Sequence, residues 1–198
     1  MLNHRGFTLI EILVVVGILG LGITSVYNFT GDLLANNLYL QEKILAEGEG
    51  RTAIKMIVRE LRGAGQSNTG VYPIDSASAT SLVFYADTDG DNLFERLHYS
   101  ASGSELRRGV VVPSGEPLTY NLNNETEKIL TARLATSSIF SFYDQTYAGT
   151  SSPLAEPVTL ADIRLVNINL LLEIDERFNS EPLQASGWAV LRNLKDNL

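Results

Sequence analysis

The sequence predicts an α+β protein in which one long N-terminal helix precedes an antiparallel β-sheet and packs against it. Two observations predict this fold. Residues 7–66 follow helical spacing, and the first half of this stretch is strongly apolar. Residues 67–198 hold short strand-like runs separated by turn residues. With 198 residues, 44% of them hydrophobic, the chain is large enough for one globular domain plus an appendage.

The segment from Phe7 to Phe29 is long enough to span a membrane. Glu11 is its only charged residue, and about 20 apolar residues cross a bilayer as a helix. Arg5 precedes the segment and favours an N-terminus in the cytoplasm with the rest of the chain outside. An uncleaved signal anchor is one interpretation. A cleaved signal peptide is disfavoured, because no small-residue cleavage site follows the apolar run.

Beyond the apolar segment, the helical pattern continues from residue 30 to about residue 66. Leu34, Leu38 and Leu45 recur at helical spacing, and Glu47 and Arg51 form a favourable i,i+4 pair. The glycine-rich run GAGQSNTG predicts the end of the helix. The second half of the helix therefore needs an apolar partner, which the β-rich remainder supplies.

The β-rich remainder contains several predicted strands. SLVFYAD and FERLHYS flank TDGDN, which predicts a hairpin, and RLVNINLLLEID is the clearest long strand. Residues 127–135 fit a strand or a short helix. LADI predicts a helical turn, and WAVLRNLKDNL a final strand with a polar tail.

Composition excludes several classes of function. The chain has no cysteine, so disulfides, thiolate metal sites and a cysteine nucleophile are excluded. Its net charge of −8 works against nucleic-acid binding, which depends on neutralising phosphates. Arg107 and Arg108 form a local basic pair, which we interpret as a solvated strand edge. No nucleic-acid partner is expected.

One acidic cluster resembles a cation site in its spacing. Asp87, Asp89, Asp91 and Glu95 offer oxygen ligands at alternating positions. The glycine and the last acid fall at the wrong positions for an EF-hand, and Asp-Gly between apolar runs is itself a hairpin signal. We favour a plain turn and expect no metal and no cofactor, with calcium left as the alternative.

The sequence offers no pattern of catalytic residues. His98 lies alone in a predicted strand, where a histidine is usually structural, and no G-x-S-x-G motif, metal-binding pair or phosphate-binding loop accompanies it. We therefore predict that the protein is not an enzyme.

RGFTLIE, residues 5–11, resembles the cleavage motif of type IV prepilins and pseudopilins. The resemblance implies that prepilin peptidase cuts after Gly6 on the cytoplasmic side and methylates the new amine of Phe7. Residues 1–6 would be the leader, residues 7–29 the transmembrane and filament-core helix, residues 30–66 its continuation, and residues 67–198 the periplasmic or extracellular domain.

Glu11 requires compensation, because an unpaired carboxylate inside a membrane helix costs about 2.5–3.5 kcal/mol on insertion scales. The amine created at Phe7 lies one helical turn away, so Glu11 can neutralise the amine of its own chain. In the resembled family, the glutamate is thought to pair with a neighbouring subunit's amine. The sequence leaves both pairings open, and we favour the intermolecular one because a plain anchor has no evident need for Glu11.

Weaker similarities extend over most of the chain. IVRELRGAGQ and FYADTDGDNLFERLHY resemble PilW-type minor pilins most, with J-type pseudopilins of type II secretion close behind. The resemblance implies a minor pilin that initiates or caps pilus assembly. Its partners would be prepilin peptidase, other minor and major pilins and, before assembly, inner-membrane lipid. It would lie in the bacterial inner membrane, then in the pilus near its tip. The alternatives are a type II secretion pseudopilin, a membrane-anchored periplasmic enzyme or binding module, and a tip adhesin or DNA-capture subunit.

Overall fold

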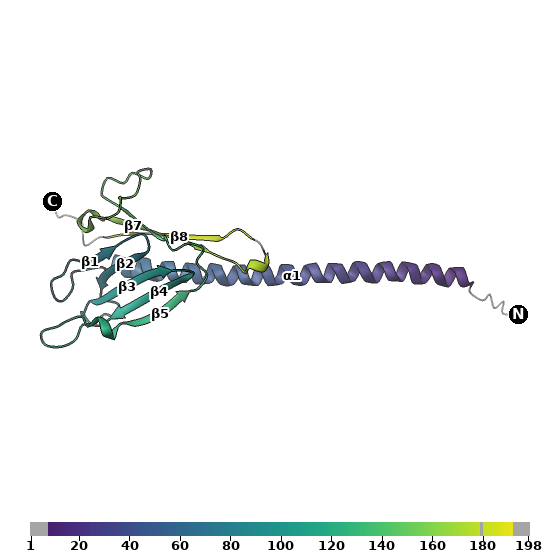
Figure 1. Ribbon diagram of the computed structural model, residues 1–198, viewed down its shortest axis with the longest axis horizontal. Coiled ribbons are helices and arrows are strands. Elements are labelled where there is room, and N and C mark those ends of the chain that lie inside the picture. The colour runs from purple at the N-terminus through teal and green to yellow at the C-terminus, as the bar shows by residue number, and fades with distance from the viewer. Residues whose placement is uncertain (1–7, 179, 192–198) are drawn as a thin grey trace. The chain divides into compact units, whose positions relative to one another are not determined.

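The structure, a computed structural model, describes residues 8–178 and 180–191 (Figure 1). The chain divides into two compact units, Met1–Glu42 and Lys43–Leu198. The first unit holds the apolar half of the long helix, and the second holds the rest of that helix with all of the strands. The predicted α+β class, with one long N-terminal helix and antiparallel strands, is confirmed.

Helix α1 runs from Leu9 to Arg62. Every residue from Thr8 to Leu38 is exposed, whereas buried residues recur at helical spacing from Ala46 onward. The helix ends where the glycine-rich run begins, and the Gly63 N–H donates to the Glu60 carbonyl at 3.0 Å. Only the second part of α1 therefore contributes to a hydrophobic core.

The larger sheet has five strands in the order β1-β2-β3-β4-β5, and every neighbouring pair is antiparallel. Its strands are β1 Ile74–Ala77, β2 Ser81–Ala86, β3 Glu95–Ser102, β4 Glu105–Val111 and β5 Thr126–Thr131. The predicted hairpin is the β2–β3 pair. The segment that fitted a strand or a short helix forms the edge strand β5.

The smaller sheet has three antiparallel strands in the order β6-β7-β8. These strands are β6 Phe140–Tyr143, β7 Leu165–Leu172 and β8 Leu183–Val190. LADI forms the predicted helical turn, a 3-10 helix over Leu160–Asp162. The strand β8 begins at Leu183, five residues before the segment that we predicted as the last strand.

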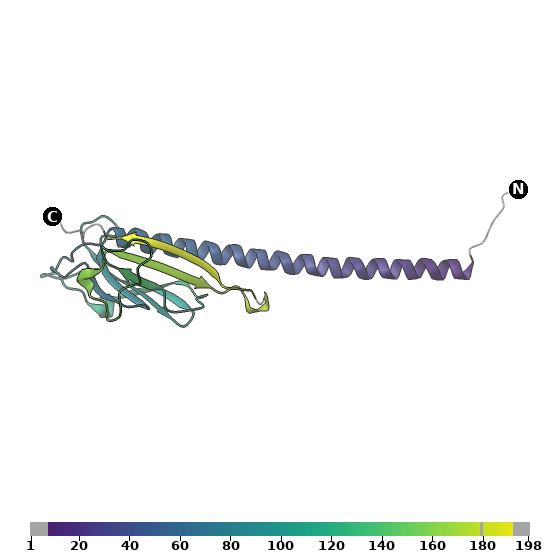
Figure 2. The ribbon, with the colours of Figure 1, turned by 90° about the horizontal axis from the view of Figure 1, so that it is seen from above.

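Within the second unit, the final turns of α1 pack against both sheets (Figures 1 and 2). Ile54, Ile57 and Leu61 join one core cluster with Phe84 and Tyr99 of the larger sheet; the same cluster includes Ile168 and Leu170 of the smaller sheet. At Gly50, an added Cβ would lie 2.5 Å from Leu172 Cδ1. At Gly187, an added Cβ would collide with Ile54. The two glycines therefore let α1 and the smaller sheet approach closely.

Candidate functional site

Helix α1 begins with a capping arrangement. The Glu11 N–H donates to the Thr8 carbonyl at 3.1 Å and to the Thr8 hydroxyl at 3.3 Å. Thr8 and Glu11 thus occupy the two defining positions of a capping box, T-x-x-E. Our sequence reasoning missed the role of Thr8, although this spacing signals it.

The Glu11 side chain is exposed among large apolar neighbours. Leu9 is 82% exposed, Ile10 70% and Ile12 56%. Gly6 and Phe7 lie outside the described residues, so the predicted pairing of Glu11 with the Phe7 amine stays a prediction. The described residues place one carboxylate at the capped start of an uncovered apolar helix.

Several hydroxyl groups in the apolar part of α1 bond to the backbone of the same helix. The hydroxyls of Ser25 and Thr30 donate to the carbonyls of Leu21 and Val26 four residues earlier, at 2.9 and 2.8 Å. Such bonds leave no hydroxyl unpaired when water is excluded. By length and composition this helix is suited to cross a membrane. A Cβ added at Gly17, Gly20 or Gly22 would meet no atom of another part of the chain within 4 Å, so another helix could approach these glycines closely.

A buried polar group joins α1 to the larger sheet. Glu60 is 5% exposed, and its carboxylate accepts two hydrogen bonds from the Arg108 guanidinium, at 2.9 and 3.1 Å. The Tyr99 hydroxyl donates to the same carboxylate at 2.5 Å. Burial raises the pKa of Tyr99 well above its usual range, and the neighbouring Glu60 carboxylate raises it further. The carboxylate is therefore paired and fixes the helix on the sheet.

The expectation of a solvated strand edge is wrong for Arg108. Strand β4 lies inside the sheet, between β3 and β5, and the Arg108 side chain is only 18% exposed. Its neighbour Arg107 points to the opposite face, where it pairs with Glu105 at 2.6 Å and Glu127 at 3.1 Å. The two adjacent arginines serve different faces because successive residues of a strand alternate.

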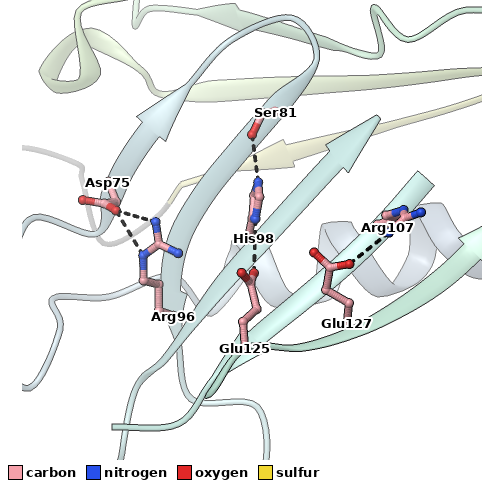
Figure 3. A network of polar contacts seen from close by, with 7 residues as sticks. All are labelled: Asp75, Ser81, Arg96, His98, Arg107, Glu125 and Glu127. Carbon is pink, nitrogen blue, oxygen red and sulfur yellow. Dashed lines mark hydrogen bonds and ion pairs between the residues drawn. The ribbon is translucent and has the colours of Figure 1, made fainter. Parts of the chain in front are cut away.

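The outer face of the larger sheet, opposite α1, carries a row of polar contacts (Figure 3). Ser81 Oγ lies 3.2 Å from His98 Nε2, and His98 Nδ1 lies 3.1 Å from Glu125 Oε1. Gly109 is the cross-strand partner of His98, and an added Cβ at Gly109 would collide with the Glu125 carboxylate. The missing side chain at Gly109 therefore makes room for Glu125 to reach His98.

The order of hydroxyl, imidazole and carboxylate in this row matches that of a nucleophile, a base and an orienting acid. A backbone N–H near the nucleophile is also needed, to stabilise an oxyanion. The Ser81 N–H already donates to Ser78 Oγ at 3.0 Å. The contacts of Ser81, His98 and Glu125 connect β2, β3 and the residue before β5.

The acidic cluster lies in the turn between β2 and β3. Asp87 accepts the N–H groups of Gly90 and Asn92 at 2.7 and 3.1 Å, and Glu95 accepts the N–H and hydroxyl of Thr88 at 2.9 and 2.8 Å. One oxygen each of Asp87, Asp89 and Glu95 lies within 4.8 Å of the others, close enough to share a cation. The hydrogen bonds within the turn account for these carboxylates, and calcium binding stays an untested alternative. Asp91 serves the same turn by accepting the Leu93 N–H at 2.7 Å.

The start of the chain matches a known family. Residues 1–27 match the family model described as the prokaryotic N-terminal methylation motif, and this range includes Gly6, Phe7 and Glu11. No curated protein matches the chain significantly.

Proposed function

We propose that this chain, whose residues 1–27 carry the methylation motif of type IV pilin-like proteins, is a minor type IV pilin that takes part in initiating or capping pilus assembly. The motif implies processing by prepilin peptidase and association with other pilins. Proteins with this motif are generally structural rather than enzymatic. The PilW-like subtype belongs to the proposal and rests on the sequence similarities alone.

The apolar part of α1 would serve in two environments. The motif and this helix fit an inner-membrane-anchored protein. We assign residues 7–29 to the membrane and later to the filament core, and the β-rich domain to the periplasm before assembly. Exposed apolar surface on this scale marks a membrane or protein contact. The neighbouring helices of a filament would cover it after the subunit leaves the bilayer.

Glu11 would direct the docking of the subunit. Cleavage after Gly6 would leave a positive amine at Phe7, next to the capped start of α1. An exposed carboxylate surrounded by Leu9, Ile10 and Ile12 supports this role most strongly, because a carboxylate in such surroundings needs a cationic partner in lipid. Pairing with the amine of an adjacent subunit would offset the cost of this charge in lipid, which reaches about 2.5–3.5 kcal/mol for a charge at the centre of a membrane helix. The same pairing would set the register between subunits.

Two measurements test the proposal in the native host. Intact-mass and N-terminal peptide analysis should show a mature chain that begins at methylated Phe7, and deletion of the prepilin peptidase should leave Met1 in place. The Glu11→Gln variant should still be cleaved but should fail to enter filaments when it replaces the wild type in a deletion strain. Asp32→Asn, farther along the same helix, is the matched control and should assemble normally.

Each part of the proposal has its own contradicting result. A mature protein that retains Met1 in the presence of the peptidase would exclude pilin-type processing. Normal piliation with Glu11→Gln would exclude the role of Glu11 in docking. If deletion of the gene abolished protein secretion and left surface pili intact, the protein would be a type II secretion pseudopilin instead.

A further inference from the structure

The outer face of the smaller sheet has an unusual composition. Strand register places Ser141, Asn167 and Trp188 in one cross-strand row. The next row contains Tyr143, Leu165 and Val190. Trp188 is 40% exposed and Val190 53%, so this face is open in the single chain.

Three aromatic rings gather at one end of this face. The Tyr143 ring lies 5.5 Å from Trp188 and 4.4 Å from Tyr147, measured between ring centroids, and Tyr147 lies 5.5 Å from Trp188. Tyr147 comes from the loop after β6. Asp144 holds this loop by accepting the Thr146 N–H at 2.8 Å and the Thr146 hydroxyl at 2.7 Å. The chain is thus turned back so that the third ring meets the other two.

Beside the rings, the same face carries amides and hydroxyls. Its next rows pair Asn169 with Ser186 and Leu171 with Gln184, and the Gln184 amide donates to the Asn169 carbonyl oxygen at 2.9 Å. Each amide offers two donor hydrogens and an acceptor oxygen with two lone pairs, so this one bond leaves most of the capacity of the pair unused. Within β6, β7 and β8, which are described throughout, no residue of this face is charged.

We propose that this face, which we call the aromatic–amide face, binds a neutral glycan. A pyranose ring has an apolar C–H face and a rim of hydroxyl groups. Aromatic rings bind the C–H face through dispersion and burial of apolar area, and amide side chains pair with hydroxyls as donors and acceptors. The inference goes beyond the proposed assembly role and does not rest on it.

The absence of Lys and Arg from the strands of the aromatic–amide face selects among ligand classes. The Asp144 carboxylate in the loop after β6 already accepts two hydrogen bonds from Thr146. Nucleic acids and anionic lipid surfaces require Lys or Arg to neutralise phosphates, and these strands present neither on this face. If a protein partner covered Trp188 and Val190, we would expect these residues to lie in an apolar centre that is surrounded by a polar rim. Here the polar side chains Asn167, Asn169 and Gln184 lie beside the rings across the face. An uncharged ligand with closely spaced hydroxyl groups fits this mixture best.

The single tryptophan of the chain makes the proposal directly measurable. The full-length protein in detergent micelles is titrated with a panel of neutral oligosaccharides built on glucose, galactose, mannose or N-acetylglucosamine, and with acidic oligogalacturonate for comparison. We expect a saturable change in Trp188 fluorescence with at least one neutral member of the panel. Calorimetry with that sugar should show that Trp188→Ala weakens binding about tenfold or more.

Additional variants separate binding from folding. Tyr147→Ala changes only a loop residue and should also weaken binding, whereas Trp188→Phe keeps an aromatic ring and should retain part of the affinity. Ile129→Ala, an exposed apolar residue on the edge strand of the other sheet, is the matched control and should bind as the wild type does.

Three results would overturn the proposal. The first is the absence of saturable binding to every neutral oligosaccharide, and the second is undiminished binding by Trp188→Ala. The third is a combination of two findings: the wild type binds no sugar, and the Trp188→Ala variant no longer associates with other pilins. This combination would identify the face as a protein contact. Because the assay needs no filament, it can fail while the assembly role stands, and the reverse also holds.

Discussion

At the scale of single residues, Glu60 determines how the helix and the larger sheet are joined. Its carboxylate is buried and accepts hydrogen bonds from Arg108 and Tyr99, so it pairs with one cation and one neutral donor. Breaking a buried pair by removing one partner typically costs about 3–5 kcal/mol, because the remaining charge stays in the interior. The neutral Tyr99 is therefore the member of the group that can be altered with the least damage.

We predict that Tyr99 makes stability depend on alkaline pH. An unfolded tyrosine loses its proton near a pKa of about 10, whereas the raised pKa of Tyr99 keeps the folded form protonated above that pH. The stability contribution is thus complete below pH 10 and is lost as pH rises toward the folded pKa. Between these two values, the free energy of unfolding should fall about 1.4 kcal/mol per pH unit more steeply in the wild type than in Tyr99→Phe.

Denaturant unfolding of both proteins from pH 8 to pH 11 checks this prediction. Tyr72→Phe alters an exposed loop tyrosine and should keep the wild-type slope. Equal slopes for the wild type and Tyr99→Phe would show that Tyr99 ionises no differently in the folded and unfolded chains.

At the scale of elements, two glycines within one turn of α1 have opposite surroundings. An added Cβ at Gly48 would meet no atom within 4 Å outside its own helix backbone, whereas an added Cβ at Gly50 would lie 2.5 Å from Leu172 Cδ1 and 3.2 Å from Ala185 Cβ. Gly48→Ala should stabilise the protein by up to about 1 kcal/mol through helix propensity. Gly50→Ala should destabilise it by about 1–3 kcal/mol because the helix and the sheet would be overpacked.

Thermal unfolding of the full chain in detergent compares the two variants directly. Each serves as the control for the other, because the same substitution is made in the same helix. Stabilisation by both variants would mean that α1 and the smaller sheet do not approach as closely at Gly50 as described.

The sequence predicted those structural features that are determined by residues close together in the chain. The end of α1 followed from its glycine run and the β2–β3 hairpin from its Asp-Gly turn, while the Glu47–Arg51 pair followed from its spacing and is present. The four-residue edge strand β1 was missed, because Ile74–Ala77 is too short to show a period. The first half of β8 was missed because a glycine, Gly187, lowers the strand propensity of this segment. The reason for a glycine at this position is its close contact with Ile54 of α1, which the local sequence does not reveal.

The candidate sites also differ in how well they could be predicted, because some lie within one short segment and others are assembled from residues far apart in the sequence. Glu11 stands out locally as the single charge in an apolar run, and T-x-x-E could have revealed the capping role of Thr8. The partners of Glu60 are 39 and 48 residues away along the chain, so no local pattern pairs them. The aromatic–amide face likewise exists only once three strands and a loop are brought together.

At the scale of the whole molecule, all of the buried hydrophobic residues in the described part of the chain lie at or beyond Ala46. We predict that residues 43–198 alone form a soluble, monomeric domain that unfolds cooperatively. Its melting temperature should lie within a few degrees of that of the β-rich domain in the full chain, since no core residue is removed. Light scattering after size exclusion and circular dichroism measure both properties.

A shorter chain, residues 53–198, provides the control. It lacks the Glu49–Thr131 hydrogen bond, which is 3.0 Å long, and the close packing at Gly50. Its melting temperature should therefore be clearly lower. Aggregation of the 43–198 chain would show that residues before Lys43 contribute to the stability of the domain.

The contact between Gly109 and Glu125 also constrains how this protein can evolve. Gly109 lies in an ordinary strand pairing, so a side chain at this position is opposed by the Glu125 carboxylate and not by the backbone conformation. Glu125 can be replaced first, at the cost of a hydrogen bond to His98, and position 109 is then free to gain a side chain. In the reverse order, the Glu125 side chain must rotate away and lose the same hydrogen bond. Descendant sequences that gain a side chain at position 109 should therefore also have lost the contact between Glu125 and His98, which couples this pair of sites in evolutionary time.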